Sequence, residues 1–303
     1  MIVAELAAGE LRRRLTGPGL RVRLGPVAAE IRSPFDAVAS GLALLYAKHE
    51  VLGAGDFADF RVAVVPPLGV RRFVAPQALF KFDGNTRFRP LPAAQAFPLL
   101  EWGLNWCITM HCHQYLIIHS AVLERHGRAL LLPAPPGSGK STLCAALAAR
   151  GWRLLSDELA LIELDGARVV PIPRPISLKN RSIDTIARFW PDAAIGDVVP
   201  DTLKGSVAHV RPPADSVQRA LEFAVPAWVV LPRYEDGAEM DLAALRKCDA
   251  FMRLVDSAFN YSVHGRAGFE ALAALVDASD CYAFTYGGAL DEAVAAFDRF
   301  ASS

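Results

Sequence analysis

The sequence Ala134-Pro135-Pro136-Gly137-Ser138-Gly139-Lys140-Ser141-Thr142 decides the expected fold of this chain. It follows an apolar run at 129–132, typical of a buried strand, and it precedes an Ala/Leu-rich segment at 143–149, typical of a helix. In that context the backbone N–H groups of residues 137–140 can point into one concavity at the positive end of the helix. The pattern predicts a phosphate-binding loop, and the alternative is a glycine-rich turn that only caps a helix.

Two side chains of this loop would carry its chemistry. Lys140 would bring positive charge to the β- and γ-phosphates of a nucleotide, and Ser141 would offer its hydroxyl to Mg²⁺. We therefore expect ATP and Mg²⁺ as cofactors. The candidate nucleotide-binding residues are Pro136, Gly137, Ser138, Gly139, Lys140, Ser141 and Thr142.

An acidic pair, Asp157-Glu158, directly follows the next apolar strand, expected at 152–155. In a parallel α/β sheet the carboxyl ends of strands point at the ligand crevice. One acid there can hold Mg²⁺ while the other accepts a proton from a nucleophile, and their mutual repulsion raises the proton affinity of one of them. Ser141, Asp157 and Glu158 are therefore candidate metal ligands. The alternative is a pair of solvated loop acids.

Composition restricts the class of protein. The chain has 303 residues, 52% of them apolar and 21% charged, which is typical of a globular protein of about two domains. The 32 basic and 32 acidic residues cancel and form no block of like charge, so neither a nucleic-acid nor a membrane partner is expected. Five cysteines without a C-x-x-C pair fit a reduced cytoplasm. The long apolar region at 97–122 is interrupted by Glu101, Asn105 and three histidines, which argues against a membrane span.

We expect an α/β fold with two domains, a small mixed α/β domain at 1–112 and a nucleotide-binding domain at 113–303. Strands are expected in the first domain at 20–24, 28–31, 60–65, 71–74 and 79–82, and helices at 35–48 and 98–110. Later strands are expected at 115–118, 121–124, 159–163, 227–231 and 282–285, with a hairpin turn at Asp165-Gly166, and helices at 183–189, 243–259, 269–277 and 289–300. The first domain shows no chemical motif, so we expect it to pack or to present a substrate.

Several stretches together resemble a known family. His119-Ser120-Ala121-Val122, the strand at 130–132, Gly137-Ser138-Gly139-Lys140-Ser141 and Arg153-Leu154-Leu155-Ser156-Asp157-Glu158 resemble the catalytic core of HPr kinase/phosphorylase over about residues 114–210. The chain is more closely similar to the bacterial HprK-related kinase A proteins in three further stretches. These are Pro173-Arg174-Pro175-Ile176-Ser177-Leu178-Lys179-Asn180, Lys204-Gly205-Ser206-Val207-Ala208-His209 and Phe259-Asn260-Tyr261.

The resemblance implies a P-loop kinase core in which Asp157 is the general base and Glu158 a Mg²⁺ ligand. It implies transfer of the γ-phosphoryl group to a serine-type hydroxyl of a small protein or peptide, with a PqqD-like peptide chaperone as a further partner and a homo-oligomer as an assembly the family allows. The family's second acid is normally Asp rather than Glu. Its second signature, rich in Arg and Gly, is absent, so the reverse phosphorylase reaction is not implied.

Three more side chains are catalytic candidates beside Asp157 and Lys140. His119 would lie near the acceptor or the phosphates, and the alternative is a buried histidine bonded to backbone. Lys179 and Lys204 occupy the place of the family's second signature along the chain, where they could stabilise charge on the transferring phosphoryl group. Either one alone could instead be an ordinary surface cation.

Other functions stay open at this stage. A P-loop ATPase or switch would use the acidic pair to activate water, and a nucleotide-dependent binding module would carry a peptide without chemistry. A kinase of a small hydroxyl metabolite such as free serine would use the same site geometry as a peptide kinase.

Overall fold

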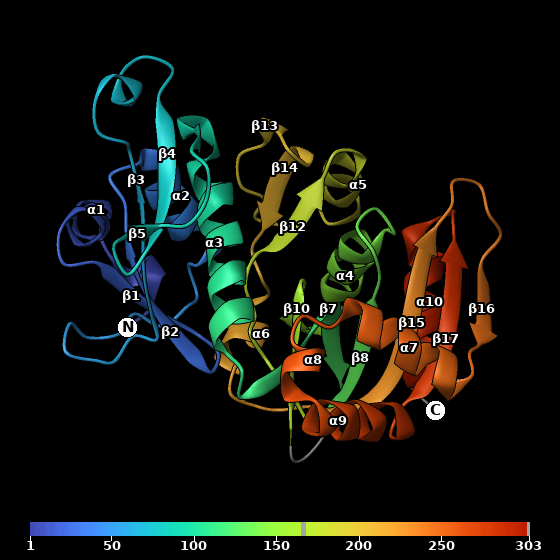
Figure 1. The fold of residues 1–303 in the computed structure, drawn as a ribbon. Helices are drawn as coiled ribbons and strands as arrows, with labels where there is room; N and C mark the ends of the chain where they lie inside the picture. Colours follow the sequence, from blue (N-terminus) through green and yellow to red (C-terminus); the bar gives the residue numbers. More distant parts are fainter. Residues whose placement is uncertain (165–167, 302–303) are drawn as a thin grey trace.

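A computed structural model describes residues 1–164 and 168–301 of the chain. This part of the chain is a mixed α/β structure whose strands form three sheets. Along the sequence, the elements run from the first sheet (blue in Figure 1) through the glycine-rich loop to the C-terminal strands and helices (orange and red).

The first sheet is built from residues near the N-terminus. Its strands are β1 (Leu20–Leu24), β2 (Val27–Arg32), β3 (Phe60–Val65), β4 (Gln77–Phe82), β5 (Asn85–Thr86) and β6 (Leu91–Pro92), in the order β1-β2-β3-β4-β5 with β6 beside β4. Its helices are α1 (Ala8–Thr16), α2 (Asp36–Leu45) and α3 (Ala96–His111). The alternation of buried Val62 and Val64 with partly exposed neighbours in β3 is the pattern of a strand with one face on the core.

The second sheet carries the glycine-rich loop. Its strand order is β11-β10-β7-β8-β15-β17-β16, with β9 also beside β7. The strands are β7 (Tyr115–Arg125), β8 (Arg128–Pro133), β9 (Arg153–Ser156), β10 (Leu159–Glu163), β11 (Val169–Val170), β15 (Val225–Tyr234), β16 (Asp241–Ala244) and β17 (Asp280–Tyr286). This sheet is mixed: β8, β15 and β17 are parallel, whereas β7 is antiparallel to β8, β9 and β10. Since β8 and β9 both run opposite to β7, their carboxyl ends still meet at one edge.

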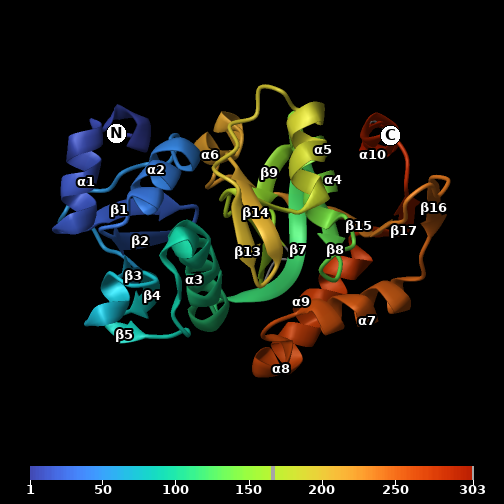
Figure 2. The ribbon, with the colours of Figure 1, turned by 90° about the horizontal axis from the view of Figure 1, so that it is seen from above.

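Helices cover both faces of the second sheet. α4 (Lys140–Ala149), α5 (Arg181–Phe189) and α10 (Leu290–Ala301) pack on one face together with the third sheet. The third sheet contains β12 (Ile176–Lys179), β13 (Val199–Thr202) and β14 (Gly205–Val210), and is followed by α6 (Ala214–Gln218). α7 (Lys247–Ser257), α8 (Tyr261–His264) and α9 (Arg266–Asp277) lie on the opposite side, as the view from above shows (Figure 2).

The two proposed domains share a core. The apolar cluster under the first sheet continues into the second, because Ile117, Leu159, Leu161, Val170 and Ile172 pack with residues of α2 and α3. Helix α3 lies between the first sheet and the third sheet in both ribbon views (Figures 1 and 2). The chain passes from α3 to the first strand of the second sheet between residues 111 and 115. The domain boundary that we expected at residue 112 stays a prediction.

Three expected elements differ in the structure. Residues 71–74 were expected as a strand, but Val70–Arg72 form a short 3-10 helix with exposed side chains. Pro66-Pro67 end β3, and no strand in the described part of the chain pairs with this segment. The helix expected at 243–259 is strand β16 followed by α7, because residues 241–244 pair with β17. The two short strands expected at 115–118 and 121–124 are one strand, β7. The turn expected at Asp165-Gly166 lies outside the described residues.

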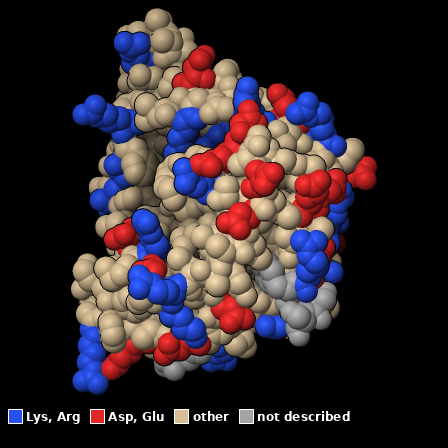
Figure 3. All heavy atoms as spheres, turned by 90° about the vertical axis from the view of Figure 1, so that its right-hand side faces the viewer, with Lys and Arg blue, Asp and Glu red and all other residues tan. Residues whose placement is uncertain are grey.

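Two surface properties follow from the fold. None of the helices in the described part of the chain has the length and apolar character that a membrane crossing requires. Figure 3 shows acidic and basic side chains interspersed on the face that is turned toward the viewer. That mixture agrees with the formal net charge of zero.

Candidate active site

The glycine-rich loop joins β8 to α4 as the sequence predicts. Gly137 and Gly139 have φ angles of 90° and 84°, in the left-handed region that side chains other than glycine rarely adopt. Gly139 precedes the first turn of α4, where the N–H groups have no partner within the helix and the helix dipole is positive. The Tyr286 hydroxyl donates a hydrogen bond of 3.0 Å to the carbonyl of Gly139 and so fixes the loop from β17. This geometry suits an anion.

Lys140 and His119 meet at the start of α4. Lys140 Nζ and His119 Nε2 are 2.8 Å apart, and Lys140 is only 6% exposed. Burial lowers the pKa of Lys140, and the charges of Glu158 and Asp157 oppose that shift. His119 comes from β7, where it faces Leu159 in the register with β10. The two side chains that the sequence suggested separately are therefore direct partners.

The acidic pair directly follows the carboxyl end of β9, as the sequence predicts, and β10 begins immediately after it. Ser156 faces Val122 and Leu159 faces His119, so β9 and β10 follow one path along β7 with Asp157 and Glu158 at the break between them. The N–H of Ser120 donates to the carbonyl of Glu158, which holds the break against β7. Glu158 therefore lies beside His119 and Asp157 is buried, so the pair is not on a solvated loop.

Asp157 is buried and joined to the glycine-rich loop. Its Oδ2 accepts hydrogen bonds from Ser141 Oγ at 3.2 Å and from the N–H of Ser177 at 2.9 Å. Its Oδ1 is buried and has no hydrogen-bond partner among the described residues. Burial and then the charge of Glu158 raise the pKa of Asp157, while Lys140 acts in the opposite direction.

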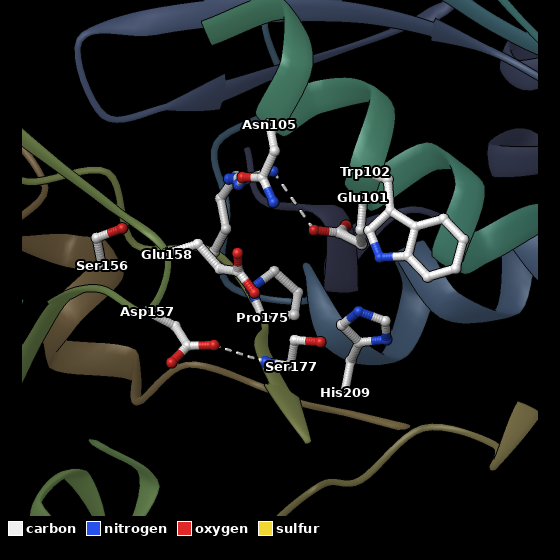
Figure 4. A pocket seen from close by; sticks show the side chains of 10 residues that line it. Glu101, Trp102, Asn105, Ser156, Asp157, Glu158, Pro175, Ser177 and His209 are labelled. Carbon is white, nitrogen blue, oxygen red and sulfur yellow. Dashed lines mark hydrogen bonds and ion pairs between the residues drawn. The ribbon is translucent and has the colours of Figure 1, made fainter. Parts of the chain in front are cut away.

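Glu158 has different surroundings. Its carboxylate oxygens lie 3.7 Å from His119 Nε2 and 3.8 Å from Lys179 Nζ. Burial would raise its pKa, but contact with His119 and the charges of Lys140 and Lys179 outweigh burial and lower it. Figure 4 shows the Glu158 side chain directed into a cavity, whereas the Asp157 carboxylate points to Ser177. Glu158 is thus ionised and faces the open space.

The remaining candidates lie around this centre. Lys179 ends β12, and Lys204 follows β13, with its Nζ 5.4 Å from the centre of the Trp102 ring. Pro136 lies in the exposed part of the loop, and Thr142 lies in the first turn of α4. The structure therefore brings together Lys140, Ser141, His119, Asp157, Glu158 and Lys179. Lys204 contacts this group through Trp102, which lines the cavity beside Glu158.

The donor set around Asp157 fits a magnesium ion. A serine hydroxyl and carboxylate oxygens are the hard ligands that Mg²⁺ prefers, and the unpartnered Oδ1 of Asp157 is available for a cation. In the described part of the chain no three His, Cys, Asp or Glu side chains gather into a metal group. A nucleotide-bound Mg²⁺ does not need such a group, because phosphates and water complete its coordination.

Sequence reasoning missed one wall of the cavity. Asp157 and Glu158 share the cavity with side chains from α3, from the segment before β12, from β12 and from β14 (Figure 4): Glu101, Trp102, Asn105, Arg174, Pro175, Ser177 and His209. The available signal was a pair of polar residues, Glu101 and Asn105, one turn apart in an otherwise apolar helix. They were interpreted only as evidence against a membrane span.

Comparison with protein-family models finds no matching family, and comparison with curated proteins finds no similar sequence. The likeness to HPr kinase therefore depends on the sequence stretches quoted above. The geometry of the site is an independent observation on which a function can be argued.

Proposed function

We propose that this chain is a P-loop kinase related to the HPr kinase core, which transfers the γ-phosphoryl group of ATP to a serine-type hydroxyl of a small protein or peptide. The observation that carries the proposal is the separation of the two acids. Asp157 is bonded to Ser141 of the glycine-rich loop, whereas Glu158 faces a cavity beside Lys179 and His119.

This separation suggests roles that reverse those implied by the resemblance. In P-loop proteins the loop serine and a strand-end Asp hold Mg²⁺ together, which is the arrangement of Ser141 and Asp157. Ser141 and Asp157 would hold a Mg²⁺ ion, which would supply positive charge beside the phosphates. Glu158 would accept the proton of the acceptor hydroxyl, and its lowered pKa is compatible with that role because proton transfer is late in a loose transition state.

The cations have positions that fit phosphoryl transfer. Lys140 is held by His119 at 2.8 Å, so its ammonium is oriented before a nucleotide arrives. Lys179 contacts Glu158, and its positive charge would also stabilise the transferring phosphoryl group. The N–H groups at the start of α4 would receive the β-phosphate.

Incubation with γ-labelled ATP and a host extract tests the proposal. We expect label on a small protein or peptide, and Lys140→Ala should lower transfer by about a hundredfold or more, because phosphoryl transfer depends on electrostatic stabilisation. Lys247→Ala, at an exposed lysine of α7, is the matched control and should transfer normally. Label released only as free phosphate would favour an ATPase or switch.

Two acid variants test the division of roles. Asp157→Asn should weaken the dependence on Mg²⁺, with partial recovery at high Mg²⁺, whereas Glu158→Gln should abolish transfer and keep ATP binding. Asp256→Asn, at an exposed carboxylate of α7, is the control. If Asp157→Asn abolished transfer at every Mg²⁺ concentration while Glu158→Gln changed only the metal dependence, the roles implied by the resemblance would hold instead.

A further inference from the structure

A second cavity lies on the other side of the glycine-rich loop. Its volume is about 210 Å³, against about 10 Å³ for the cavity beside Glu158. The smaller cavity has space for about one water, whereas the larger one can take a ring system. In Figures 1 and 2 two elements that line the second cavity, β17 and α10, lie on the side of α4 that faces away from α3.

Three loops meet at the edge of the sheet where this cavity lies. β8, β15 and β17 are parallel, so the segments that follow them lie at the same edge. The glycine-rich loop follows β8, residues 235–240 follow β15, and residues 287–289 follow β17. The second and third of these segments contribute to the lining of the cavity. The carboxyl ends of parallel strands are where ligands bind in α/β sheets.

Two contacts connect the surroundings of this cavity to the glycine-rich loop. Tyr286 lines the cavity, and its hydroxyl donates to the carbonyl of Gly139 at 3.0 Å. The N–H of Tyr234, at the end of β15, donates to the carbonyl of Ser138 at 3.0 Å. The cavity therefore has a fixed position relative to the phosphate-binding loop.

The segment at 235–240 is held on β17. The N–H of Glu235 donates to the carbonyl of Tyr286 at 3.0 Å, and the N–H of Gly237 donates to the carbonyl of Gly287 at 3.3 Å. A Cβ at Gly287 would overlap the carbonyl oxygen of Glu235, so this close approach requires glycine. The wall that this segment forms is therefore built into the fold.

A nucleotide on the glycine-rich loop would have its nucleoside end at this cavity. The γ-phosphate belongs near Lys140 and the acidic pair, which lie toward β7 on one side of β8. β15 is the neighbour of β8 on the other side. The cavity beside Glu158 is too small for a nucleoside, so the chain of phosphates would run from the acids toward β15 and β17.

The lining of the cavity suits a flat ring with donor groups at its edge. Its small residues are Ala238, Gly288, Ala289 and Ala293. Met240 adds a flexible thioether, a group that packs well on aromatic rings. Glu239 and Glu292 are exposed at the cavity, and a carboxylate can only accept hydrogen bonds. Two carboxylates would also repel a phosphate group, which favours the base and not the phosphates as the occupant.

We propose that this cavity binds the nucleobase, and that it selects a purine with an exocyclic amino group, adenine or guanine. The proposal rests on the nucleotide-dependent function given above and names the selective part of its phosphate donor. The ring would pack between Met240 and the small residues. Its amino group would donate to the carboxylate of Glu239 or of Glu292.

Isothermal titration of the full chain in the presence of Mg²⁺ tests the selectivity with ATP, GTP, ITP, CTP and inorganic triphosphate. ITP has a purine ring without an exocyclic amino group. ATP, GTP or both should bind about ten- to a hundredfold more tightly than ITP, as expected for one hydrogen bond to a charged group. CTP should bind more weakly than the preferred purine nucleotide, because its smaller ring buries less surface.

Variants at the cavity locate the base. Ala289→Phe should fill the cavity and raise the Kd of the preferred nucleotide about tenfold or more, with an unchanged Kd for inorganic triphosphate. Ala295→Phe, at an exposed position of α10 that does not line the cavity, is the matched control. The double variant Glu239→Ala/Glu292→Ala should lose the preference over ITP. Glu270→Ala, at an exposed carboxylate of α9, should keep it.

The outcomes separate this proposal from the proposed function. If ITP bound as tightly as both ATP and GTP, recognition of the amino group would be overturned, and equal binding of CTP would overturn the choice of a purine. If folded Ala289→Phe bound the preferred nucleotide like the wild type, the base would lie elsewhere while the phosphate site remained. If the wild-type chain bound neither ATP nor inorganic triphosphate, the nucleotide-dependent function itself would be lost.

Discussion

Gly139→Ala is the sharpest test of the glycine-rich loop, because the structure separates two costs at neighbouring glycines. At Gly137, with φ of 90°, an added Cβ would meet no atom within 4 Å. At Gly139, with φ of 84°, it would lie 2.4 Å from the Tyr286 hydroxyl and 2.9 Å from Tyr234 Cβ. The first substitution therefore tests backbone strain alone, and the second adds a steric overlap.

The expected losses follow from these distances. Strain in the left-handed region costs about 1–2 kcal/mol for a residue with a Cβ, which is the whole loss expected for Gly137→Ala. Gly139→Ala should lose about 1–3 kcal/mol more, because overpacking against a fixed neighbour has that cost. Tyr286 is a fixed neighbour, since it is 2% exposed and its ring stacks on Phe284 with centroids 5.3 Å apart.

The assay is urea unfolding of both alanine variants, of Tyr286→Phe and of the double variant Gly139→Ala/Tyr286→Phe. Removing the hydroxyl loses its bond to the Gly139 carbonyl, worth about 1 kcal/mol, but it also removes the closer of the two overlaps and leaves the one with Tyr234 Cβ. The double variant should therefore be more stable than the sum of the single losses by about 0.5–3 kcal/mol. Equal losses at Gly137 and Gly139, or additive losses in the double variant, would refute this reasoning.

Two further predictions concern buried charge. Asp157 has a raised pKa, so its contribution to stability is complete below the ordinary pKa of an aspartate and is lost as pH rises through the raised value. Asp157→Asn should therefore melt at a higher temperature than the wild type near neutral pH, by about 2–4 °C for each kcal/mol, and the difference should close on acidification in a thermal-shift series. A lower melting temperature at neutral pH would contradict this. Glu124 and Arg153 form an ion pair in which both side chains are 3% exposed, so Glu124→Ala should lose about 3–5 kcal/mol in urea unfolding, since it leaves a buried charge without its partner. The exposed pair of Glu270 with Arg266 is the comparison, and Glu270→Ala should cost under about 1 kcal/mol.

The sequence predicted the local elements best where one periodic pattern decided them. The strands at 60–65 and 159–163 were predicted with the bounds that the structure shows, because alternating or continuous apolar residues fill them. The strand expected at 71–74 was wrong, since Val and Phe favour strands only when a partner strand is present. The antiparallel direction of β7 could not be predicted for a related reason, because it depends on the pairing of β7 with β8, β9 and β10, which no local pattern contains.

In the candidate site, too, the residues of a local motif could be predicted, whereas those brought in by the tertiary fold could not. Lys140, Ser141 and Asp157 could be chosen because a short motif places phosphate chemistry on them, and the structure brings them together with His119. Their roles in catalysis stay predictions. The α3 wall could not be predicted, because Asn105 reaches Arg174 only through the fold, across 69 positions of the sequence.

The pairing of Ser156 with Val122 and of Leu159 with His119 has a consequence for insertions and deletions between β9 and β10. Two residues, Asp157 and Glu158, fill the interval opposite Ala121 and Ser120, so the chain length there is fixed by the pairing on both sides. A one-residue deletion would move every side chain of β10 to the other face of the sheet. Leu159 and Leu161 would leave the core under α3, and Ala160 and Ile162 would leave the core under α7 and α9. We therefore expect homologous chains to differ at these two positions by substitution and not by insertion or deletion, even where the neighbouring loops vary in length.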